Sequence, residues 1–161
     1  MGKNVSVGPY SIIEHDVNIG NNTCIDANAH IKPYTTIGKD CKIFHGAVVG
    51  GIPQDLKFKG EKSQLIIGDT TTIREYCTLN RGTKEKGETT IGSHSLLMAY
   101  VHVAHDCSIG DHSILANAVQ LGGHVEIGNH VTIGGMTPVH QFCKIGDYPF
   151  TGGGYRIVQD V

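Results

Sequence analysis

An aliphatic residue recurs at every sixth position along this chain. From Val7 to Ile157 there are 26 such positions, and 22 of them hold Ile, Leu or Val, where chance would give about six. The position four residues further on is also restricted, because it holds a small or β-branched residue in nearly every repeat. A period of six matches neither the 3.6 residues of a helix nor the two of an ordinary strand.

The period is typical of a short strand followed by a turn, with three such units closing an 18-residue triangular coil. The aliphatic residue and the small residue then both point inward, and parallel backbone hydrogen bonds join coils about 4.8 Å apart. The sequence therefore predicts an all-β fold, a parallel β-helix over residues 1–161 with between eight and nine coils. Such a stack extends its core along one axis only, so its ends and flat faces are left uncovered. We expect oligomerisation to cover them.

Two segments, at about 51–64 and 80–90, break the pattern. Charged residues occupy their inward positions, Asp55 and Glu61 in the first and Glu85 in the second. We expect both segments to leave the stack as loops. Their basic residues predict a positive patch that receives phosphates or an acidic partner. These residues are Lys57, Lys59, Lys62, Arg81, Lys84 and Lys86.

Composition excludes several classes of protein. The formal net charge is −2, which argues against a strongly basic nucleic-acid binder. No apolar run is long enough for a transmembrane helix, and the first residues, MGKNVSVGPYS, lack the apolar core of a secretory signal. We therefore expect a cytoplasmic protein with no nucleic-acid partner and no membrane span.

The phase of the repeat also sorts the cysteines and histidines. Cys41, Cys77, Cys107 and Cys143 fall in the small inward position, so we expect buried thiols rather than a disulfide or a metal site. No histidine falls in either inward position. Five are predicted to be ordinary solvated surface residues, namely His15, His30, His94, His112 and His130. Four others cluster in adjacent coils, namely His102, His105, His124 and His140.

Residues 18 apart stack directly, which places His105 beside Gly123 and Gln141, and Asp106 beside His124. A neutral imidazole is a competent general base near pH 7, and Asp106 is placed to hold its other nitrogen. Gly123 has no side chain, so its N–H can approach a developing oxyanion. No Ser or Cys nucleophile is placed with the same neighbouring groups. The pattern therefore favours direct attack of a substrate hydroxyl on an activated acyl group. The competing interpretation is a corner histidine bonded to backbone.

Longer motifs carry a family resemblance. Residues 96–110, LLMAYVHVAHDCSIG, are followed by ILANAVQLGGHVEIG and IGGMTPVHQFCKIG, and the first loop contains PQDLKFKGE. These segments resemble the UDP-N-acetylglucosamine O-acyltransferases, hexapeptide-repeat enzymes that open lipid A synthesis. The resemblance implies a left-handed parallel β-helix that forms a homotrimer, with active sites between neighbouring subunits.

The resemblance also implies the reaction and the residues that carry it. A 3-hydroxyacyl chain would pass from acyl carrier protein to the 3-position of UDP-N-acetylglucosamine. No cofactor is implied, because the carrier protein brings the chain on its own phosphopantetheine. His105 matches the catalytic base, Asp106 its orienting acid and Gly123 the oxyanion-stabilising N–H. The matching substrate-binding positions are Gln54, Asp55, Lys57, Asn80, His102, His124, His140 and Gln141. The acyl tail is implied to lie near Met136, Phe150 and Gly153.

Two departures from the family leave alternatives open. The family's C-terminal helical domain, which adds basic contacts to the nucleotide, is expected to be absent here. Asn80 stands where many members have His, which leaves open a related transferase that acts on a 3-amino sugar nucleotide. A non-catalytic trimeric scaffold or truncated form and the N-acyltransferase of the same pathway are further alternatives. The loop PQDLKFKGE argues against a transferase that uses acetyl-CoA.

A zinc site of the gamma-type carbonic anhydrases is a further alternative, because that family shares the trimeric β-helix. His94 and His130 have part of the required spacing, but position 135 is Gly135 instead of the second histidine. We therefore expect no metal in this protein.

Overall fold

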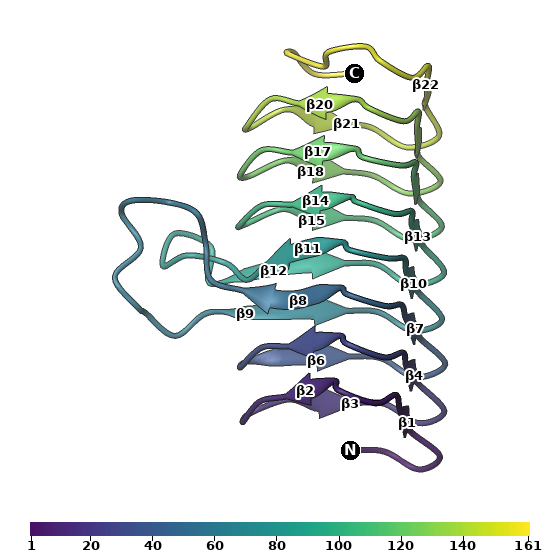
Figure 1. Cartoon of the computed structure of the whole chain (residues 1–161). Helices are drawn as coiled ribbons and strands as arrows, with labels where there is room; N and C mark the ends of the chain where they lie inside the picture. Colours follow the sequence, from purple (N-terminus) through teal and green to yellow (C-terminus); the bar gives the residue numbers. More distant parts are fainter.

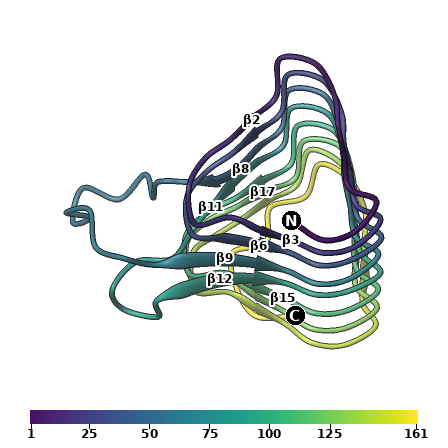
Figure 2. The same cartoon turned by 90° about the horizontal axis from the view of Figure 1, so that it is seen from below.

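A computed structural model describes all residues from 1 to 161. It is a left-handed parallel β-helix of 22 short strands with no helix. The coils stack in one column, with the two termini at opposite ends (Figure 1), and the column has a triangular outline when seen along its axis (Figure 2). No segment forms a helix of the length and apolarity needed to cross a membrane. The fold class predicted from the repeat is confirmed.

Each face of the triangle is one parallel sheet. Sheet A contains β1 (Ser6–Val7), β4 (Cys24–Ile25), β7 (Lys42–Ile43), β10 (Thr72–Ile73), β13 (Leu96–Leu97), β16 (Ile114–Leu115), β19 (Thr132–Ile133) and β22 (Phe150–Thr151). Sheet B contains β2 (Ile12–Ile13), β5 (His30–Ile31), β8 (Val48–Gly51), β11 (Thr78–Asn80), β14 (His102–Val103), β17 (Gln120–Leu121) and β20 (Pro138–Val139). Sheet C contains β3 (Asn18–Ile19), β6 (Thr35–Ile37), β9 (Gln64–Ile67), β12 (Glu88–Ile91), β15 (Ser108–Ile109), β18 (Glu126–Ile127) and β21 (Lys144–Ile145).

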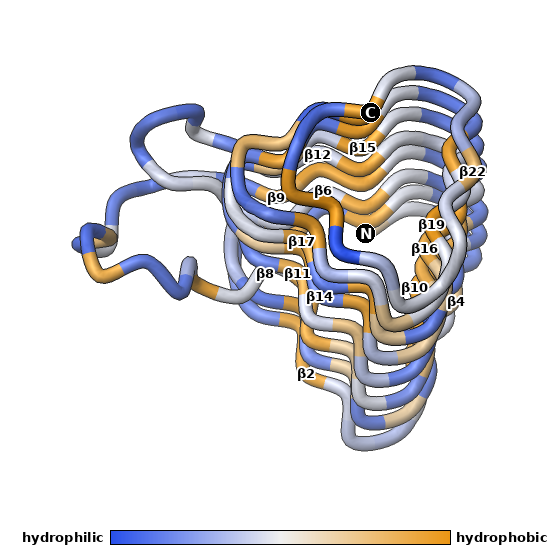
Figure 3. The backbone as a smooth tube through the Cα atoms, turned by 90° about the horizontal axis from the view of Figure 1, so that it is seen from above, coloured by the Kyte–Doolittle hydropathy of each residue, from blue (hydrophilic) through white to orange (hydrophobic).

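The core is a single column of side chains inside the triangle. It contains 31 buried apolar residues in one cluster, and the hydrophobic stretches of the coils fall on the strands (Figure 3). The aliphatic positions of the inner coils, such as Ile31, Leu79 and Leu121, are almost fully buried. Val7 is 43% exposed because no coil covers the first one. The inward direction of both repeat positions is confirmed.

The small inward position has a polar function as well as a steric one. Its hydroxyl or thiol donates to a backbone carbonyl in the next coil, as in Thr23 Oγ1 to Gly38 O (2.8 Å) and Cys107 Sγ to Gly122 O (3.1 Å). All five cysteines are free, and Cys24 alone is exposed. Burial raises the pKa of the Cys77 and Cys107 thiols to about 12, so these buried thiols are poor nucleophiles.

Every corner turns through a residue in the left-handed region. Nineteen non-glycine residues have φ between +53° and +68°, and they recur every sixth position outside the loops. Asp106 (φ 60°) and His124 (φ 62°) belong to this series, as does the unremarkable Ala118 (φ 59°). The backbone at Asp106 and His124 is therefore that of an ordinary corner and is not a local strain at a functional site.

Two loops leave the stack at the same corner, between sheets B and C (Figures 1 and 2). Residues 52–63 join β8 to β9, and residues 81–87 join β11 to β12. Across the first loop Ile37 pairs with Ile67, a spacing of 30, and across the second Ile73 pairs with Leu97, a spacing of 24. Coils without a loop keep a spacing of 18. The insertions are thus 12 and 6 residues, both multiples of six, and the repeat continues in phase after each.

Sheet A has eight strands and sheets B and C have seven each, which makes seven coils and the start of an eighth. The predicted eight to nine included the residues of the two loops, and the 18 inserted residues account for one coil of that number.

We predict that Ile109→Asp abolishes cooperative folding, because residue 109 is 3% exposed and a buried charge without a partner costs several kcal/mol. Ile109→Val is the matched control and should lose only about 1 kcal/mol. Urea denaturation followed by circular dichroism measures both. An Asp variant with the wild-type midpoint would show that this side chain does not point into the core.

Candidate active site

The predicted column of residues is present at the corner between sheets B and C. His105 and Asp106 form this corner between β14 and β15, and the next coil places Gly123 and His124 beside them. His124 N donates to His105 O at 3.0 Å, and Phe142 N donates to Gly123 O at 3.1 Å. This is the same corner from which both loops emerge, and the second loop lies one coil before His105.

His105 and Asp106 form a hydrogen-bonded pair. The His105 Nδ1 lies 2.9 Å from Asp106 Oδ2, and the two side chains are 14% and 0% exposed. Because a carboxylate only accepts, Nδ1 donates the proton of this bond. Nε2 has no hydrogen-bond partner within the chain. The geometry therefore leaves Nε2 open to a substrate.

The second loop closes over Asp106. Thr83 N donates to Asp106 Oδ1 at 2.8 Å, and Thr83 Oγ1 donates to Oδ2 at 2.6 Å. Burial by itself raises the Asp106 pKa, but the bonds from Thr83 and His105 and the nearby His124 outweigh it, so the pKa lies below its ordinary value. Thr83 was not predicted as a site residue, because its place at the small position of the repeat does not show that the loop carries it to Asp106.

Gly123 packs directly against the imidazole. A Cβ at this position would lie 2.6 Å from His105 Cε1 and 2.8 Å from Nε2, so no other residue fits while the ring stays in place. The Gly123 N–H makes no hydrogen bond within the chain.

A comparison with another corner shows why this N–H is free. At the corner between sheets C and A, the equivalent N–H groups donate to side chains one coil on. Ser93 N bonds Asp111 Oδ1 at 2.7 Å, and Asp111 N bonds Asn129 Oδ1 at 2.9 Å. Gln141, the residue one coil on from Gly123, does not accept this bond. The Gly123 N–H is therefore available to a ligand beside His105.

His124 adds a second ring to the site. It stacks on Phe142 with centroids 4.6 Å apart and meets His105 edge-on at 5.2 Å. Its Nε2 lies 3.4 Å from Glu85 Oε2 and 3.6 Å from Asp106 Oδ2. Glu85 was not predicted as a site residue, because the sequence indicates only that this charged residue leaves the stack and does not show where the loop carries it.

His105, Asp106 and His124 are also close enough to be considered as metal ligands. One donor atom from each lies within 4.8 Å of the others. The Asp106 carboxylate, however, already accepts two hydrogen bonds from Thr83 and one from His105. A metal would have to replace these bonds, so the arrangement favours a hydrogen-bonded acid–base pair.

A pocket of about 540 Å³ brings the loop and the histidines together. The first loop contributes Gln54, Asp55 and Lys57, which the sequence predicted to contact substrate. The coils contribute His105, His124 and Gln141, and Leu56, Glu85 and Phe142 complete the lining. An adjoining pocket on sheet B contains Gly123, His140, Gln141 and Arg156.

Other predicted residues lie apart from this pocket within one protomer. His102 is on the outer face of sheet B, where its Nδ1 lies 2.7 Å from Thr78 Oγ1, and burial lowers its pKa despite that bond. Asn80 is 6% exposed, and its Oδ1 has no partner. Met136 and Phe150 are 75% and 77% exposed on other faces of the column. Gly153 stacks against Gly135 near the last coil.

The predicted basic patch is smaller than expected. Arg81 is only 7% exposed and lies between aromatic rings. Lys86 Nζ donates to Ser108 Oγ and to Asp106 O. The prediction was wrong for Arg81, which is buried, whereas Lys86 remains exposed although its ammonium bonds the coils.

The prediction of solvated surface histidines was also incomplete. His30 Nε2 lies 2.7 Å from Glu14 Oε1. His94, His112 and His130 are exposed but stack on one another, with centroids 4.9 and 4.7 Å apart. Residues 18 apart share a column, so identical rings in successive coils necessarily lie face to face.

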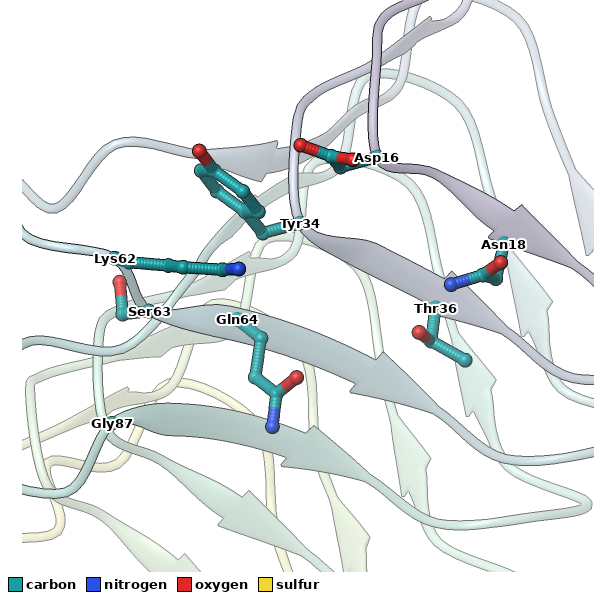
Figure 4. Close-up of a pocket in the computed structure, with 8 residues that line it drawn as sticks. All are labelled: Asp16, Asn18, Tyr34, Thr36, Lys62, Ser63, Gln64 and Gly87. Atoms are coloured by element: carbon teal, nitrogen blue, oxygen red, sulfur yellow. The ribbon is translucent and has the colours of Figure 1, made fainter.

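A separate polar pocket lies at the foot of the first loop (Figure 4). Its lining contains Asp16, Asn18, Tyr34, Thr36, Lys62, Ser63, Gln64 and Gly87. None of the residues predicted to bind substrate belongs to it. The structure therefore separates this pocket from the one that contains His105.

Comparison with known proteins agrees with this geometry. A family model described as bacterial transferase hexapeptide (six repeats) matches residues 1–33, 16–51 and 88–123. The UDP-N-acetylglucosamine acyltransferase structure from Bacteroides fragilis, called LpxA, has a TM-score of 0.81 and 39% identity, and the match covers 96% of this chain and 68% of that one. The chain belongs to the UDP-N-acetylglucosamine O-acyltransferase family.

Other members of this acyltransferase family are more similar in sequence. LpxA from Acinetobacter baumannii has a TM-score of 0.97 and 47% identity, over 99% of this chain and 64% of that one. The acyl-[acyl-carrier-protein]–UDP-N-acetylglucosamine O-acyltransferase of Halorhodospira halophila is 49% identical over the whole chain. The chain spans 63% of the length of that relative.

We predict that Thr83→Val raises the Asp106 pKa and lowers stability at pH 7 by about 2 kcal/mol, the value of a hydrogen bond to a charged group. A carboxylate whose pKa is lower in the folded state stabilises the fold at pH values above its pKa in the unfolded chain, near 3.9. This contribution disappears as the pH falls through the pKa of the folded state. The difference between variant and wild type should therefore shrink in acid.

Carboxyl carbon NMR and urea denaturation at several pH values measure these effects. Thr90→Val removes a hydroxyl that bonds only Ser108 and serves as the control. An unchanged Asp106 titration in Thr83→Val would contradict the closed loop.

Proposed function

We propose that this chain transfers a 3-hydroxyacyl group from acyl carrier protein to the 3-hydroxyl of UDP-N-acetylglucosamine. The observation that carries this proposal is the free Nε2 of His105 beside the unbonded N–H of Gly123, at the edge of a pocket. The names of the relatives supply the two substrates.

The mechanism is a direct transfer with one base. His105 Nε2 takes the proton of the sugar hydroxyl as its oxygen attacks the thioester carbonyl carbon. The carbonyl oxygen becomes an oxyanion, and the Gly123 N–H donates to it. The intermediate then collapses, the C–S bond breaks, and the leaving thiolate takes the proton back from Nε2. No covalent enzyme intermediate and no resident cofactor are needed.

Asp106 supports this base without leaving its carboxylate form. Its low pKa keeps it ionised at neutral pH, so it fixes the tautomer in which Nε2 is basic and stabilises the imidazolium formed during attack. Thr83 holds the carboxylate from the other side. The positive charge therefore forms beside a negative group that does not move.

The separation of the remaining residues supports a homotrimer as part of the proposal. His102 lies on sheet B and Phe150 on sheet A, whereas Met136 is at the corner between them, and Met136 and Phe150 are strongly exposed. Residues on separate faces can form one site only across a contact between copies of the chain. Sedimentation velocity should therefore show a trimer, and a stable monomer with full activity would exclude the shared site.

The main alternatives are separable in the same assay. Asn80 buries an amide oxygen without a partner, and a hydroxyl and an amine are both donors from which such an oxygen can accept. Rates of acyl transfer to 3-hydroxy and to 3-amino sugar nucleotides, measured under the same conditions, distinguish these acceptors. A folded chain that binds substrate without turning over either acceptor is a scaffold.

We predict that His105→Ala lowers the rate of acyl transfer by about 100-fold or more, because it removes the base. The assay supplies 3-hydroxyacyl carrier protein and UDP-N-acetylglucosamine and identifies the product by mass spectrometry. His94→Ala is the control, because His94 is an exposed histidine at a different corner, between sheets C and A. Undiminished turnover by a folded His105→Ala variant would remove His105 from the mechanism.

We predict that Gly123→Ala also lowers the rate by about 100-fold, because its Cβ would lie within 2.8 Å of two imidazole atoms and displace the base by roughly the distance that costs this much. Gly146→Ala is the matched control, because its Cβ would lie 3.6 Å from the nearest atom. If both variants keep wild-type activity, His105 is not held against Gly123 during the reaction.

A further inference from the structure

Arg81 is a buried cation without a carboxylate partner. It is 7% exposed, it forms no ion pair, and its Nε has no hydrogen-bond partner. A buried charge is costly unless something compensates it. Two aromatic rings do so, because the Arg81 Cζ lies 5.2 Å from the Tyr34 ring centroid and 5.4 Å from the Phe58 ring centroid.

The three residues of this contact come from three different segments. Tyr34 is the corner residue one coil before the first loop, with φ of 62°. Phe58 is near the middle of that loop, and Arg81 begins the second loop, where its N–H donates to Gly51 O at 2.9 Å. The guanidinium therefore clamps the first loop against the coils, and we call this contact the Arg81 clamp.

Lys62 gives the loop a second contact with the same tyrosine. Its Nζ lies 5.2 Å from the Tyr34 ring centroid, and Figure 4 shows the two side chains next to each other. Glu61 joins the loops further out, because its carboxylate accepts from Lys59 N at 2.8 Å and from Lys84 N at 3.3 Å. The return half of the loop is thus fixed at several points.

The clamped phenylalanine belongs to the turn that lines the pocket. Phe58 N donates to Asp55 O at 3.0 Å, and Lys57 N donates to Asp55 Oδ1 at 2.9 Å. Asp55 and Lys57 both line the pocket with His105. Movement of the Phe58 ring would therefore move both polar groups relative to the base.

We propose that Arg81 is a positioning residue that fixes the 55–58 turn, and with it Asp55 and Lys57, for binding of the sugar nucleotide. This inference rests on the proposed function, since it assigns the turn to the acceptor and the histidine to the chemistry. The clamp then acts on acceptor affinity and leaves the chemical step to His105.

The test is a set of variants at Phe58, which is half-buried in the loop and outside the core. Phe58→Leu removes the ring, and Phe58→Tyr keeps it. For Phe58→Leu we expect the KM for UDP-N-acetylglucosamine to rise about tenfold, the loss expected for one well-placed cation–π contact. The kcat should stay within about twofold, and Phe58→Tyr should restore the wild-type KM.

Arg81→Lys gives the matching change on the other side of the clamp. A lysine keeps the charge but cannot stack as a plane, so we expect the same rise in KM. Combining Arg81→Lys with Phe58→Leu should add little, because both break one contact. Lys59→Ala is the control, since only the backbone N–H of Lys59 contributes a hydrogen bond.

The rate of amide hydrogen exchange in the 52–63 loop measures how firmly the Arg81 clamp holds this loop, and the measurement does not require turnover. Phe58→Leu and Arg81→Lys should speed exchange in this loop by about tenfold and leave the coils unchanged. Faster exchange with an unchanged KM would overturn the positioning role, and unchanged exchange would overturn the clamp itself.

Calorimetric titration with UDP-N-acetylglucosamine covers the case in which the wild-type chain shows no turnover. Tenfold weaker binding by Phe58→Leu would then support the inference while the proposed reaction fails. Equal affinity in the two proteins, or no binding by the wild type, would overturn it.

Discussion

The whole molecule depends on the register of its parallel hydrogen-bond ladder. Each strand bonds the strand one coil earlier and one coil later, so an inward side chain always packs on the equivalent side chain of its neighbours. A shift by a single residue would turn the aliphatic column outward. The two insertions of 12 and 6 residues respect this limit, because each leaves the following coils in phase.

This constraint leaves chemistry only a few places to occur. The interior is filled, and the flat faces repeat the same short strands, so variation is concentrated at the corners and in the loops. His105, Asp106, Gly123 and His124 occupy an ordinary corner with ordinary backbone geometry. What distinguishes that corner is the set of side chains gathered there and the two loops that emerge beside it; unlike the corner between sheets C and A, it has no Asp and Asn ladder that occupies its N–H groups.

The loops complete the site in two different ways. The second loop reaches inward, where Thr83 holds the Asp106 carboxylate. The first loop reaches outward and supplies Asp55 and Lys57 to the pocket. The Arg81 guanidinium links the loops to each other and to the coil below. In the proposed mechanism, separate interactions therefore support the base and the acceptor contacts, so affinity and rate can be altered independently.

The sequence determined the fold and the column of stacked residues that contains the site. A period of six fixes which residues point inward, and a coil of 18 places His105 beside Gly123 and Asp106 beside His124, because a stacked coil carries the same position directly above itself. The cysteines in the small position could be read as buried for the same reason. The motifs beginning at residue 96 identified the family to which the chain belongs.

Only the tertiary structure decided which contacts the loops make. Thr83 and Glu85 fall at positions of the six-residue repeat, but the period does not show that Thr83 bonds Asp106 or that Glu85 approaches His124, because these contacts follow from how the second loop folds back. Arg81 was expected to be exposed because it is a charged residue in a loop, yet the rings of Tyr34 and Phe58 enclose it. The coil of 18 assigns His102 to sheet B, Met136 to a corner and Phe150 to sheet A, but a period does not show which outward residues meet.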